Sequence, residues 1–455
     1  MRCGFYETEI TPPFGTTIFG YFGKRVNSKI RTKLYAKAAV MESNGKYVAM
    51  LCLDCLGIPK NLAEFVRERV SEKTEIDKDS IIVGATHSHT SGPGRDNLGN
   101  YKDRVPLLEN EPVMNEELDS FYIKMVQLLS ADAVISAYHR LEEATVSFAI
   151  GEAEDVNFVR EYVLKNGEVR TNPGEYIDEV VKPVAEPDKS LPVFVVKNKE
   201  GNPMGILTSF ALHHDTLSSI DEISADYSGL VADNMKKKFG TDFVTVFYSG
   251  FCGNINHVNF GVNPREVLKT DYIASVLTEE ILKTMEKAEP LKDERLDSKW
   301  DSVTIKKREV PKEHTERVLA LKKNPPSGTM TIADPYCDIM VYAGANGYIN
   351  SYINDASTER EVPVHVLRIG ECLIYSFCGE IFSQFGDMIR EKSPSDKLML
   401  VTKANTDKID CYVPTREMFL PNVYESTYTS ATLCPDAGYK MVDLAIEMAE
   451  KIYNA

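Results

Sequence analysis

Apolar runs of strand character alternate along the chain with segments of helical periodicity. Near the N-terminus, residues 34–41 and 46–54 are rich in β-forming side chains, and the Asn-Gly turn at 44–45 between them predicts a hairpin. Residues 62–70 repeat apolar side chains at helical spacing among charges, and residues 80–85 return to strand character. This succession predicts a hairpin, a helix and a further strand.

The same alternation continues to the C-terminus. It predicts further strands over residues 192–196, 204–212, 243–248, 364–369, 372–377 and 398–402, and helices over residues 228–239, 381–392 and 437–453. Such alternation is typical of an α/β architecture, so we expect a mixed β-sheet core flanked by helices. No linker interrupts the pattern, which predicts one domain over residues 1–455. Residues 95–117 and 289–334 carry the weakest patterns, and each is interpreted as an insertion, a lid or a surface connection.

Composition and charge narrow the class of protein. The 455 residues are 43% apolar and 26% charged, which are ordinary globular values. Lys and Arg number 52 against 68 Asp and Glu, and the net charge of −16 repels nucleic acid and anionic lipid. No apolar run approaches the roughly 20 residues of a membrane span, and the N-terminus shows no secretory signal. We therefore expect a cytoplasmic protein that acts on a small molecule, without a nucleic-acid or membrane partner; its oligomeric state stays open.

Five of the eight histidines lie in three short motifs that each follow a predicted strand. Side chains at the carboxyl ends of strands lie where α/β folds form their crevices, so this shared placement indicates a site at those ends. In the first motif an extended chain directs His87 and His89 to the same side. Both then bind one cation, or one binds it while the other carries a proton. The glycine-bearing turn that follows favours function over coincidence.

The second motif combines His213, His214 and Asp215 at the end of another predicted strand. Two imidazoles and a carboxylate together fit a metal site or a proton relay at least as well as a buried polar cluster. Asp226 follows shortly after, and it either joins this group or caps the helix predicted to begin nearby.

A third motif places Asn254, Asn256 and His257 in a glycine-bearing loop after a strand. Side-chain amides can donate to a developing oxyanion, although loops of this kind are common without any function. Glu380 follows a further predicted strand. An acid at this position is also typical of the N-terminus of a helix, where it interacts favourably with the helix dipole. Tyr424 lies in a loop whose composition assigns it no role.

Taken in order, these motifs resemble the catalytic domain of the neutral (non-lysosomal) ceramidase family. The resemblance covers nearly the whole chain. It rests on residues 11–15, 20–21, 34–38, 85–94, 210–213, 224–229, 253–256, 379–380 and 424–425, of which Ala85-Thr-His-Ser-His-Thr-Ser-Gly-Pro-Gly94 is the most specific.

The resemblance implies one zinc ion held by His87, His213, Glu380 and Tyr424. Mixed imidazole and oxygen ligation suits zinc, although such ligands also admit manganese or iron. His89, on the same strand end as His87, is then the candidate proton carrier. By the same resemblance, Arg160 steadies developing negative charge or anchors a polar group of the substrate.

The chain departs from the family at a position that bears on mechanism. Where the ceramidases carry a serine implicated in catalysis, this chain has Asn256, which cannot be acylated, and His257 follows it. We therefore expect metal-activated water to attack the substrate directly. The expected absence of a signal peptide, a membrane-binding stretch and an appended C-terminal domain favours a small polar substrate over ceramide.

Three functional hypotheses follow. The first is a zinc-dependent hydrolase of an amide bond, whose candidate catalytic residues are His89, Arg160, Asn254, Asn256 and His257. The second keeps the metal and changes the bond to an ester or a lactone, because the same hydroxide attacks either carbonyl. The third is a non-catalytic, metal-dependent binding protein.

Overall fold

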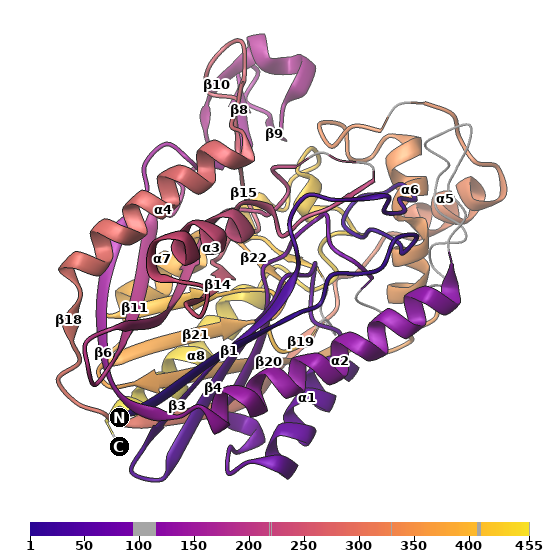
Figure 1. The fold of residues 1–455 in the computed structure, drawn as a ribbon. Helices are drawn as coiled ribbons and strands as arrows, with labels where there is room; N and C mark the ends of the chain where they lie inside the picture. The colour runs from indigo at the N-terminus through magenta and orange to yellow at the C-terminus, as the bar shows by residue number, and fades with distance from the viewer. Residues whose placement is uncertain (94–114, 218, 220, 329, 407–410, 455) are drawn as a thin grey trace.

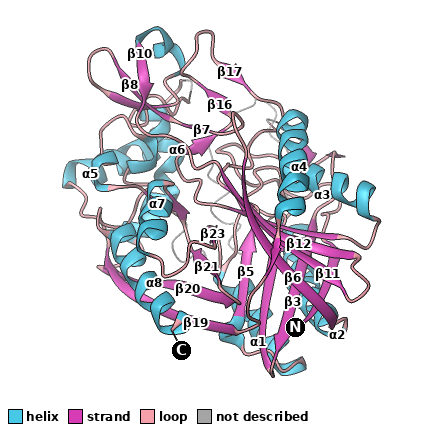
Figure 2. Cartoon of the chain, turned by 90° about the vertical axis from the view of Figure 1, so that its left-hand side faces the viewer, coloured by secondary structure: helices cyan, strands magenta, loops and turns pink. Residues whose placement is uncertain are grey.

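Two β-sheets pack face to face, and helices cover the outer face of each sheet (Figures 1 and 2). The computed structural model describes residues 1–93, 115–217, 219, 221–328, 330–406 and 411–454. Its four layers confirm the predicted α/β fold, in which a mixed β-sheet core is flanked by helices.

The larger sheet has the strand order β14-β12-β11-β6-β1-β3-β4-β5, with β18 beside β6. Its strands are β1 (Arg2–Glu9), β3 (Tyr35–Ser43), β4 (Lys46–Leu53), β5 (Ile81–Ala85), β6 (Glu142–Glu152), β11 (Ser190–Asn198), β12 (Pro203–Phe210), β14 (Val244–Ser249) and β18 (Glu289–Pro290). The pairs β12–β14 and β4–β5 are parallel, and the other neighbours are antiparallel. Each end of the sheet therefore carries two strands that run the same way.

The smaller sheet has the order β19-β20-β21-β23. Its strands are β19 (Leu296–Lys306), β20 (Glu359–Ile369), β21 (Cys372–Phe377) and β23 (Leu398–Val401), the last two parallel. Short strands complete the described part of the chain: β2 (Lys29–Ile30) pairs β13 (Glu222–Ile223), β7 (Phe158–Val159) pairs β15 (Ile255–Asn256), β16 (Val258–Asn259) pairs β17 (Glu266–Val267), β22 (Glu380–Ile381) pairs β24 (Tyr412–Val413), and β8 (Glu161–Leu164) lies between β9 (Val169–Thr171) and β10 (Val180–Pro183).

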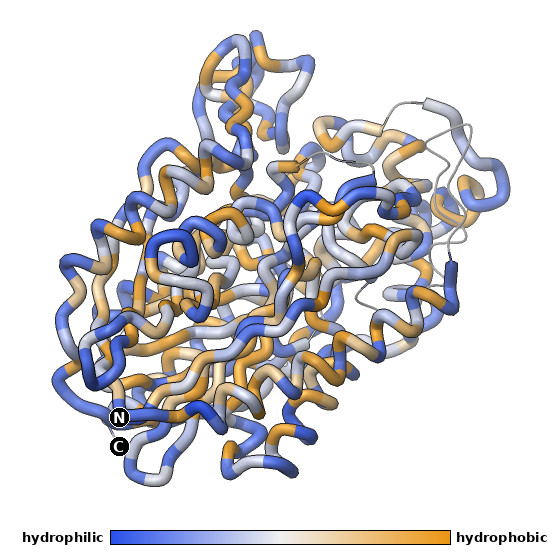
Figure 3. The backbone as a smooth tube through the Cα atoms, in the orientation of Figure 1, coloured by the Kyte–Doolittle hydropathy of each residue, from blue (hydrophilic) through white to orange (hydrophobic). Residues whose placement is uncertain are grey.

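Alternating side chains along a strand pack against different layers of the fold. In β4, Met50 and Cys52 face the smaller sheet and join Leu367 of β20 in one buried cluster. Their neighbours, such as Leu51, face the helices on the other side. A strand buried on both faces carries apolar residues at nearly every position, which is why the sequence shows continuous apolar runs there. In Figure 3 many hydrophobic residues, drawn in orange, lie in the central part of the molecule where these strands run.

Helices cover both outer faces. α1 (Lys60–Lys73) and α2 (Glu116–His139) pack on one half of the larger sheet, and α3 (Asp226–Phe239) and α4 (Thr270–Lys287) pack on the other half. α7 (Gln384–Lys392) and α8 (Ala437–Tyr453) cover the smaller sheet. α5 (Lys312–Lys323) and α6 (Asp338–Tyr348) pack against each other beside this sandwich (Figure 1).

Two stretches with weak sequence patterns have different outcomes. Residues 289–334 contain β19, which pairs with β20 along its whole length, and α5. Much of β19 is exposed or half-buried, so it lacks the apolar run that marks a buried strand. Of residues 95–117, positions 95–114 lie outside the described residues, and Asn115 caps the N-terminus of α2.

The carboxyl ends of three strands from different parts of the fold meet at one end of the sandwich. The hydroxyl of Ser249, the last residue of β14, donates to the carbonyl of Thr86 after β5, at 2.8 Å. From the smaller sheet, the amide of Thr402 donates to the carbonyl of Ser249 at 2.9 Å, and the carbonyl of Lys403 accepts from the amide of Ala85 at 3.2 Å. These contacts place the residues that follow β5, β14 and β23 around one point.

Candidate metal centre

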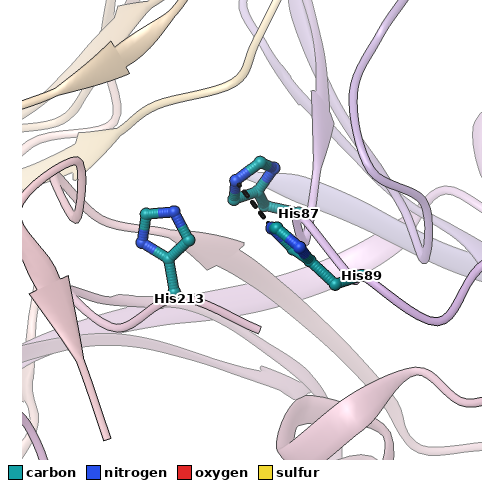
Figure 4. Close-up of side chains that lie close together, drawn as sticks. All are labelled: His87, His89 and His213. Atoms are coloured by element: carbon teal, nitrogen blue, oxygen red, sulfur yellow. Dashed lines mark hydrogen bonds between the residues drawn. The ribbon is translucent and has the colours of Figure 1, made fainter. Parts of the chain in front are cut away.

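Three histidines converge where these strands end (Figure 4). His87 and His89 follow β5, and His213 follows β12. Each histidine offers one ring nitrogen, and these three nitrogens all lie within 4.8 Å of one another. Among the described residues, this is the one group of three or more His, Cys, Asp or Glu side chains close enough together to hold a metal ion.

The backbone brings His87 and His89 together by a conformation other than the extended one that was expected. His87 has a φ of +67°, so the backbone is left-handed there and the predicted extended conformation is wrong. The imidazoles of His87 and His89 nevertheless lie with their ring centroids 4.8 Å apart, and their Nε2 atoms are 3.4 Å apart. The turn at His87 therefore replaces strand alternation as the device that brings the two rings together.

Backbone carbonyls fix which nitrogen of two histidines faces the centre. Nδ1 of His87 lies 2.7 Å from the carbonyl of Leu56, and Nδ1 of His213 lies 2.7 Å from that of Cys252. A carbonyl can only accept, so each Nδ1 carries a proton and donates it. Nε2 then offers its lone pair to the centre when the ring is neutral, which is the usual arrangement of metal-binding histidines.

Glu380 adds a carboxylate to the three imidazoles. It lies in β22, just after β21 of the smaller sheet, and its Oε2 is 3.1 Å from Nε2 of His213 and 3.5 Å from Nε2 of His87. Burial alone raises the pKa of Glu380, but the neighbouring His87 and Lys403 outweigh it and hold the pKa well below its ordinary value. The carboxylate is therefore ionised at neutral pH.

The protonation of the imidazoles fits a cation at this point. Burial is the main cause that lowers the pKa of His87 and His89, so both are neutral near pH 7. Burial also lowers the pKa of His213, but its hydrogen bonds with Cys252 and Glu380 help to raise it to about 10. A proton on His213 Nε2 then bridges to Glu380. A metal ion takes the place of such a proton when it binds, and one carboxylate with neutral imidazoles is a ligand set that zinc accepts.

Two residues at the centre were missed by the sequence analysis. Nζ of Lys403 lies 3.6 Å from Oε1 of Glu380, and the ring of Tyr412 stacks on His213 at 6.4 Å. Lys403 follows β23 as the histidines follow their strands, so the strand-end signal could have found it. No comparable signal marks Tyr412.

The ring of Tyr412 lies between Tyr424 and His213 of the cluster. The ring of Tyr424 meets Tyr412 edge-on at 5.9 Å and Phe22 at 6.3 Å. Burial raises the pKa of its phenol to about 12, so the hydroxyl is neutral at pH 7.

Arg160 is buried behind the centre. Its guanidinium donates to the carbonyl of Gly253 at 2.8 Å, pairs with Glu425 at 2.7 Å and lies 5.3 Å above the ring of Tyr412. Glu425 is itself fully buried, so this ion pair is sequestered from water. The pair fixes the loop of Gly253 relative to the segment that carries Tyr424.

The two asparagines of the same loop bind different neighbours. The amide of Asn254 donates to Gln384 at 3.1 Å, and its carbonyl oxygen accepts from the backbone of Ser383 at 2.8 Å. Asn256 donates to the side chain of Asn172 at 2.8 Å. Each amide thus commits one of its two protons to a neighbouring side chain.

His214 and Asp226 lie outside the cluster. His214 stacks on Tyr227 at 4.0 Å and is fully buried. Asp226 is the first residue of α3, and its carboxylate accepts from the side chain and the backbone of Thr216 and from the amide of Tyr227. The N-cap of α3 is Ala225 and no side chain caps the helix there, so the predicted capping role of Asp226 is wrong.

An open cleft of about 520 Å³ adjoins the centre. The ring of its lining residue Tyr21 lies 5.2 Å from that of His89, and Phe22, also in the lining, contacts Tyr424. The rest of the lining mixes polar and apolar residues: Asn172, Gly174, Asp215, Asn256, His257, Val258, Phe260, Arg265, Val267, Met330, Thr331, Ile332 and Met340.

The fold of the chain is similar to that of solved ceramidases. The chain is similar to the crystal structure of neutral ceramidase from Pseudomonas aeruginosa, with a TM-score of 0.73 and 17% identity over 100% of this chain and 74% of that one. A second solved structure, a ceramidase complexed with C2, gives a TM-score of 0.72 and 16% identity over 100% and 75% of the two chains.

The family model of the neutral/alkaline non-lysosomal ceramidase N-terminal domain matches residues 2–272. The chain therefore belongs to the neutral/alkaline non-lysosomal ceramidase family, which is a family of amide-bond hydrolases. No curated protein matches the sequence. No helix in the described part of the chain has both the length and the apolar character of a membrane span.

Proposed function

We propose that this protein is a zinc-dependent hydrolase that cleaves an amide bond of a small polar molecule with metal-activated water. The observation that carries the proposal is the approach of His87 Nε2 and His213 Nε2 to Glu380 Oε2, at 3.5 and 3.1 Å. Catalytic zinc sites keep a coordination position for water, and zinc can expand to five ligands, so a fourth protein ligand still leaves room for the water.

His87, His213 and Glu380 are the proposed core of the ligand set, and Tyr424 is the proposed fourth ligand. Tyr424 contacts Tyr412, which stacks on His213, so its phenol belongs to the same side-chain assembly. His89 Nε2 is 3.4 Å from His87 Nε2, which suits a proton carrier beside the ligands. Zinc content separates the two roles: Tyr424→Phe weakens zinc binding under this proposal, and His89→Gln retains zinc but loses turnover.

Zinc supplies Lewis acidity to the substrate carbonyl and makes its bound water a nucleophile at neutral pH. His89, neutral because of its burial, accepts the proton that the attacking water loses. Arg160 is held in place by Gly253 and Glu425. Its proposed role is to stabilise the negative charge that develops on the substrate near residues 253–256. The second amide protons of Asn254 and Asn256 are the proposed further donors to the substrate carbonyl.

Direct attack by water follows from the residue at position 256. An asparagine cannot form an acyl-enzyme, and the side chain of Asn256 is engaged with Asn172. The cleft volume lies within the range of small-molecule sites. Its lining includes the charged or ionisable side chains of Asp215, His257 and Arg265, which can bind a polar substrate. This lining supports a small polar substrate in preference to ceramide.

The test combines metal analysis with a substrate screen. Protein purified without added metal is assayed for bound zinc and for hydrolysis of matched amides and esters. We expect one zinc per chain and turnover of amides, with both lost in His87→Ala and retained in His139→Ala, which alters an exposed histidine at the end of α2. Full zinc content in His87→Ala contradicts the ligand assignment, and turnover confined to esters or lactones contradicts the amide bond.

A further inference from the structure

Asp215 and His257 form a side-chain pair on the wall of the cleft. Oδ1 of Asp215 lies 3.4 Å from Nδ1 of His257. Asp215 comes two residues after His213, and His257 ends the loop that contains Asn256, so two separate strand ends supply the pair. Both side chains line the cleft, and both are mostly buried, with side-chain exposures of 20% and 10%.

The pair and His89 contain polar atoms that the fold leaves without regular hydrogen bonds. Within the described residues, Nδ1 of His89, Oδ1 of Asp215 and Nδ1 of His257 are buried and lack such a partner. The separation of 3.4 Å between the last two atoms is slightly long for a hydrogen bond, as in many enzymes before the substrate binds. A buried polar atom without a partner calls for an explanation, and a catalytic role is one such explanation.

Asp215 acts electrostatically on His257, 3.4 Å away. Burial lowers the pKa of His257, but contact with Asp215 outweighs it and raises the pKa above the ordinary histidine value. The carboxylate therefore stabilises a proton on the imidazole of His257, which lines the cleft.

The residue after Asn256 supplies an ionisable side chain to this loop. Asn256 has no ionisable side chain, and it binds Asn172 through its amide. Its neighbour His257 is the ionisable group that this loop presents to the cleft. When an amide is cleaved, an alkylamine leaves slowly unless its nitrogen receives a proton.

We propose that His257 is the catalytic acid that protonates the leaving nitrogen, and that Asp215 is the positioning residue that orients His257. This inference rests on the proposed hydrolysis and extends it to a residue pair outside the metal centre. The arrangement matches the general rule that a carboxylate at one imidazole nitrogen fixes the tautomer and stabilises the imidazolium.

The attacking water transfers one proton to Nε2 of His89 while its oxygen bonds to the carbonyl carbon. The carbon–nitrogen bond then breaks, the electron pair remains on nitrogen, and Nε2–H of His257 donates its proton to that nitrogen. A carboxylic acid and a neutral amine result. His89 releases its proton to the solvent of the open cleft and His257 regains one, which restores both groups.

The test compares substrates that differ in their need for a proton. The probes are acetamides of alkylamines, acetanilides and p-nitrophenyl acetate, whose leaving group departs as an anion. The zinc-loaded variants are His257→Gln and Asp215→Asn, with His139→Gln as the matched exposed control. Zinc content is measured for each variant, so that loss of the metal is distinguished from loss of the acid.

We expect His257→Gln to lower kcat on the alkylamides by roughly 10²–10³-fold and to leave p-nitrophenyl acetate hydrolysis nearly unchanged. Asp215→Asn shows the same selective loss with a smaller magnitude, and His139→Gln shows none. An equal loss on all probes, or no loss on alkylamides, overturns the inference. Wild-type protein that binds zinc but hydrolyses none of the probes overturns the proposed function and this inference with it, whereas wild-type turnover without the selective loss overturns this inference alone.

Discussion

Nε2 of His213 lies 3.1 Å from Oε2 of Glu380, although 167 residues separate them along the chain. His213 follows a strand of the larger sheet, and Glu380 follows a strand of the smaller one. The contact therefore exists only when the two sheets are packed together. A cation bound between these side chains stabilises the packed state and has no equivalent site in the unfolded chain.

Zinc is accordingly expected to raise the melting temperature of the metal-free protein. A ligand at 100 times its Kd adds about 2.7 kcal/mol to the free energy of unfolding. The Tm of chelator-treated protein, measured with and without zinc, checks this for the wild type and for Glu380→Gln. The variant should lose most of the zinc-dependent shift, and an equal shift in both proteins speaks against Glu380 as a ligand.

Ser249 is expected to stabilise the junction of the strand ends. Its hydroxyl donates at 2.8 Å to the carbonyl of Thr86, which lies next to His87. Ser249→Ala removes a buried hydrogen bond and leaves that carbonyl without its donor, so a loss of about 1–3 kcal/mol in the free energy of unfolding is expected. Urea unfolding measures it. Ser302→Ala, which removes an exposed hydrogen bond to Glu361, is the control, and similar effects of the two changes contradict a special role for the junction.

Restoring a serine at position 256 is expected to leave the mechanism unchanged. Asn256→Ser breaks the contact with Asn172 and adds a hydroxyl that the proposed chemistry does not use. Turnover should therefore fall or stay level, and mass spectrometry during turnover should find no acylated Ser side chain. Asn172→Ala breaks the same contact without adding the hydroxyl and serves as the control. An acyl adduct together with faster turnover is evidence against direct attack by water.

His365 is expected to make the protein less stable in mild acid. It is fully buried between the sheets, its Nε2 lies 2.9 Å from the hydroxyl of Ser298, and burial with the nearby Arg67 lowers its pKa to about 3. In the unfolded chain its pKa is near 6.5. Between these values the unfolded state binds a proton that the native state does not, so stability falls as the pH drops from about 6.5 towards 3.

The free energy of unfolding at about pH 7 and about pH 4.5 tests this expectation in the wild type and in His365→Gln. The variant should lose less stability than the wild type between the two pH values, because its side chain cannot titrate. Equal losses in both proteins mean that the burial of a neutral His365 does not contribute to the acid sensitivity.

Buried strands and strand-end histidines were predictable because their signals are local. Residues 46–54 were predicted as a strand from their apolar run, and β4 occupies Lys46–Leu53. Their placement after strands pointed to His87 and His213, and the family resemblance added Glu380, which the structure brings next to both. The family resemblance that those motifs suggested is confirmed by the match over residues 2–272.

The remaining features depend on contacts that the sequence does not display. β1 combines polar and apolar residues, yet it lies within the larger sheet because β3 and β6 pair with it on either side. The left-handed turn at His87 arises in a residue type that seldom adopts it. The stacking of Tyr412 on His213 follows from the packing of the two sheets, which no local pattern encodes.

An anomalous difference map collected at the zinc absorption edge, from crystals grown with zinc, tests the central claim most directly. The account predicts one peak within bonding distance of His87 Nε2, His213 Nε2 and Glu380 Oε2, near the mouth of the cleft that Asp215 and His257 line. A peak elsewhere, or none at these side chains in crystals saturated with the metal, contradicts it.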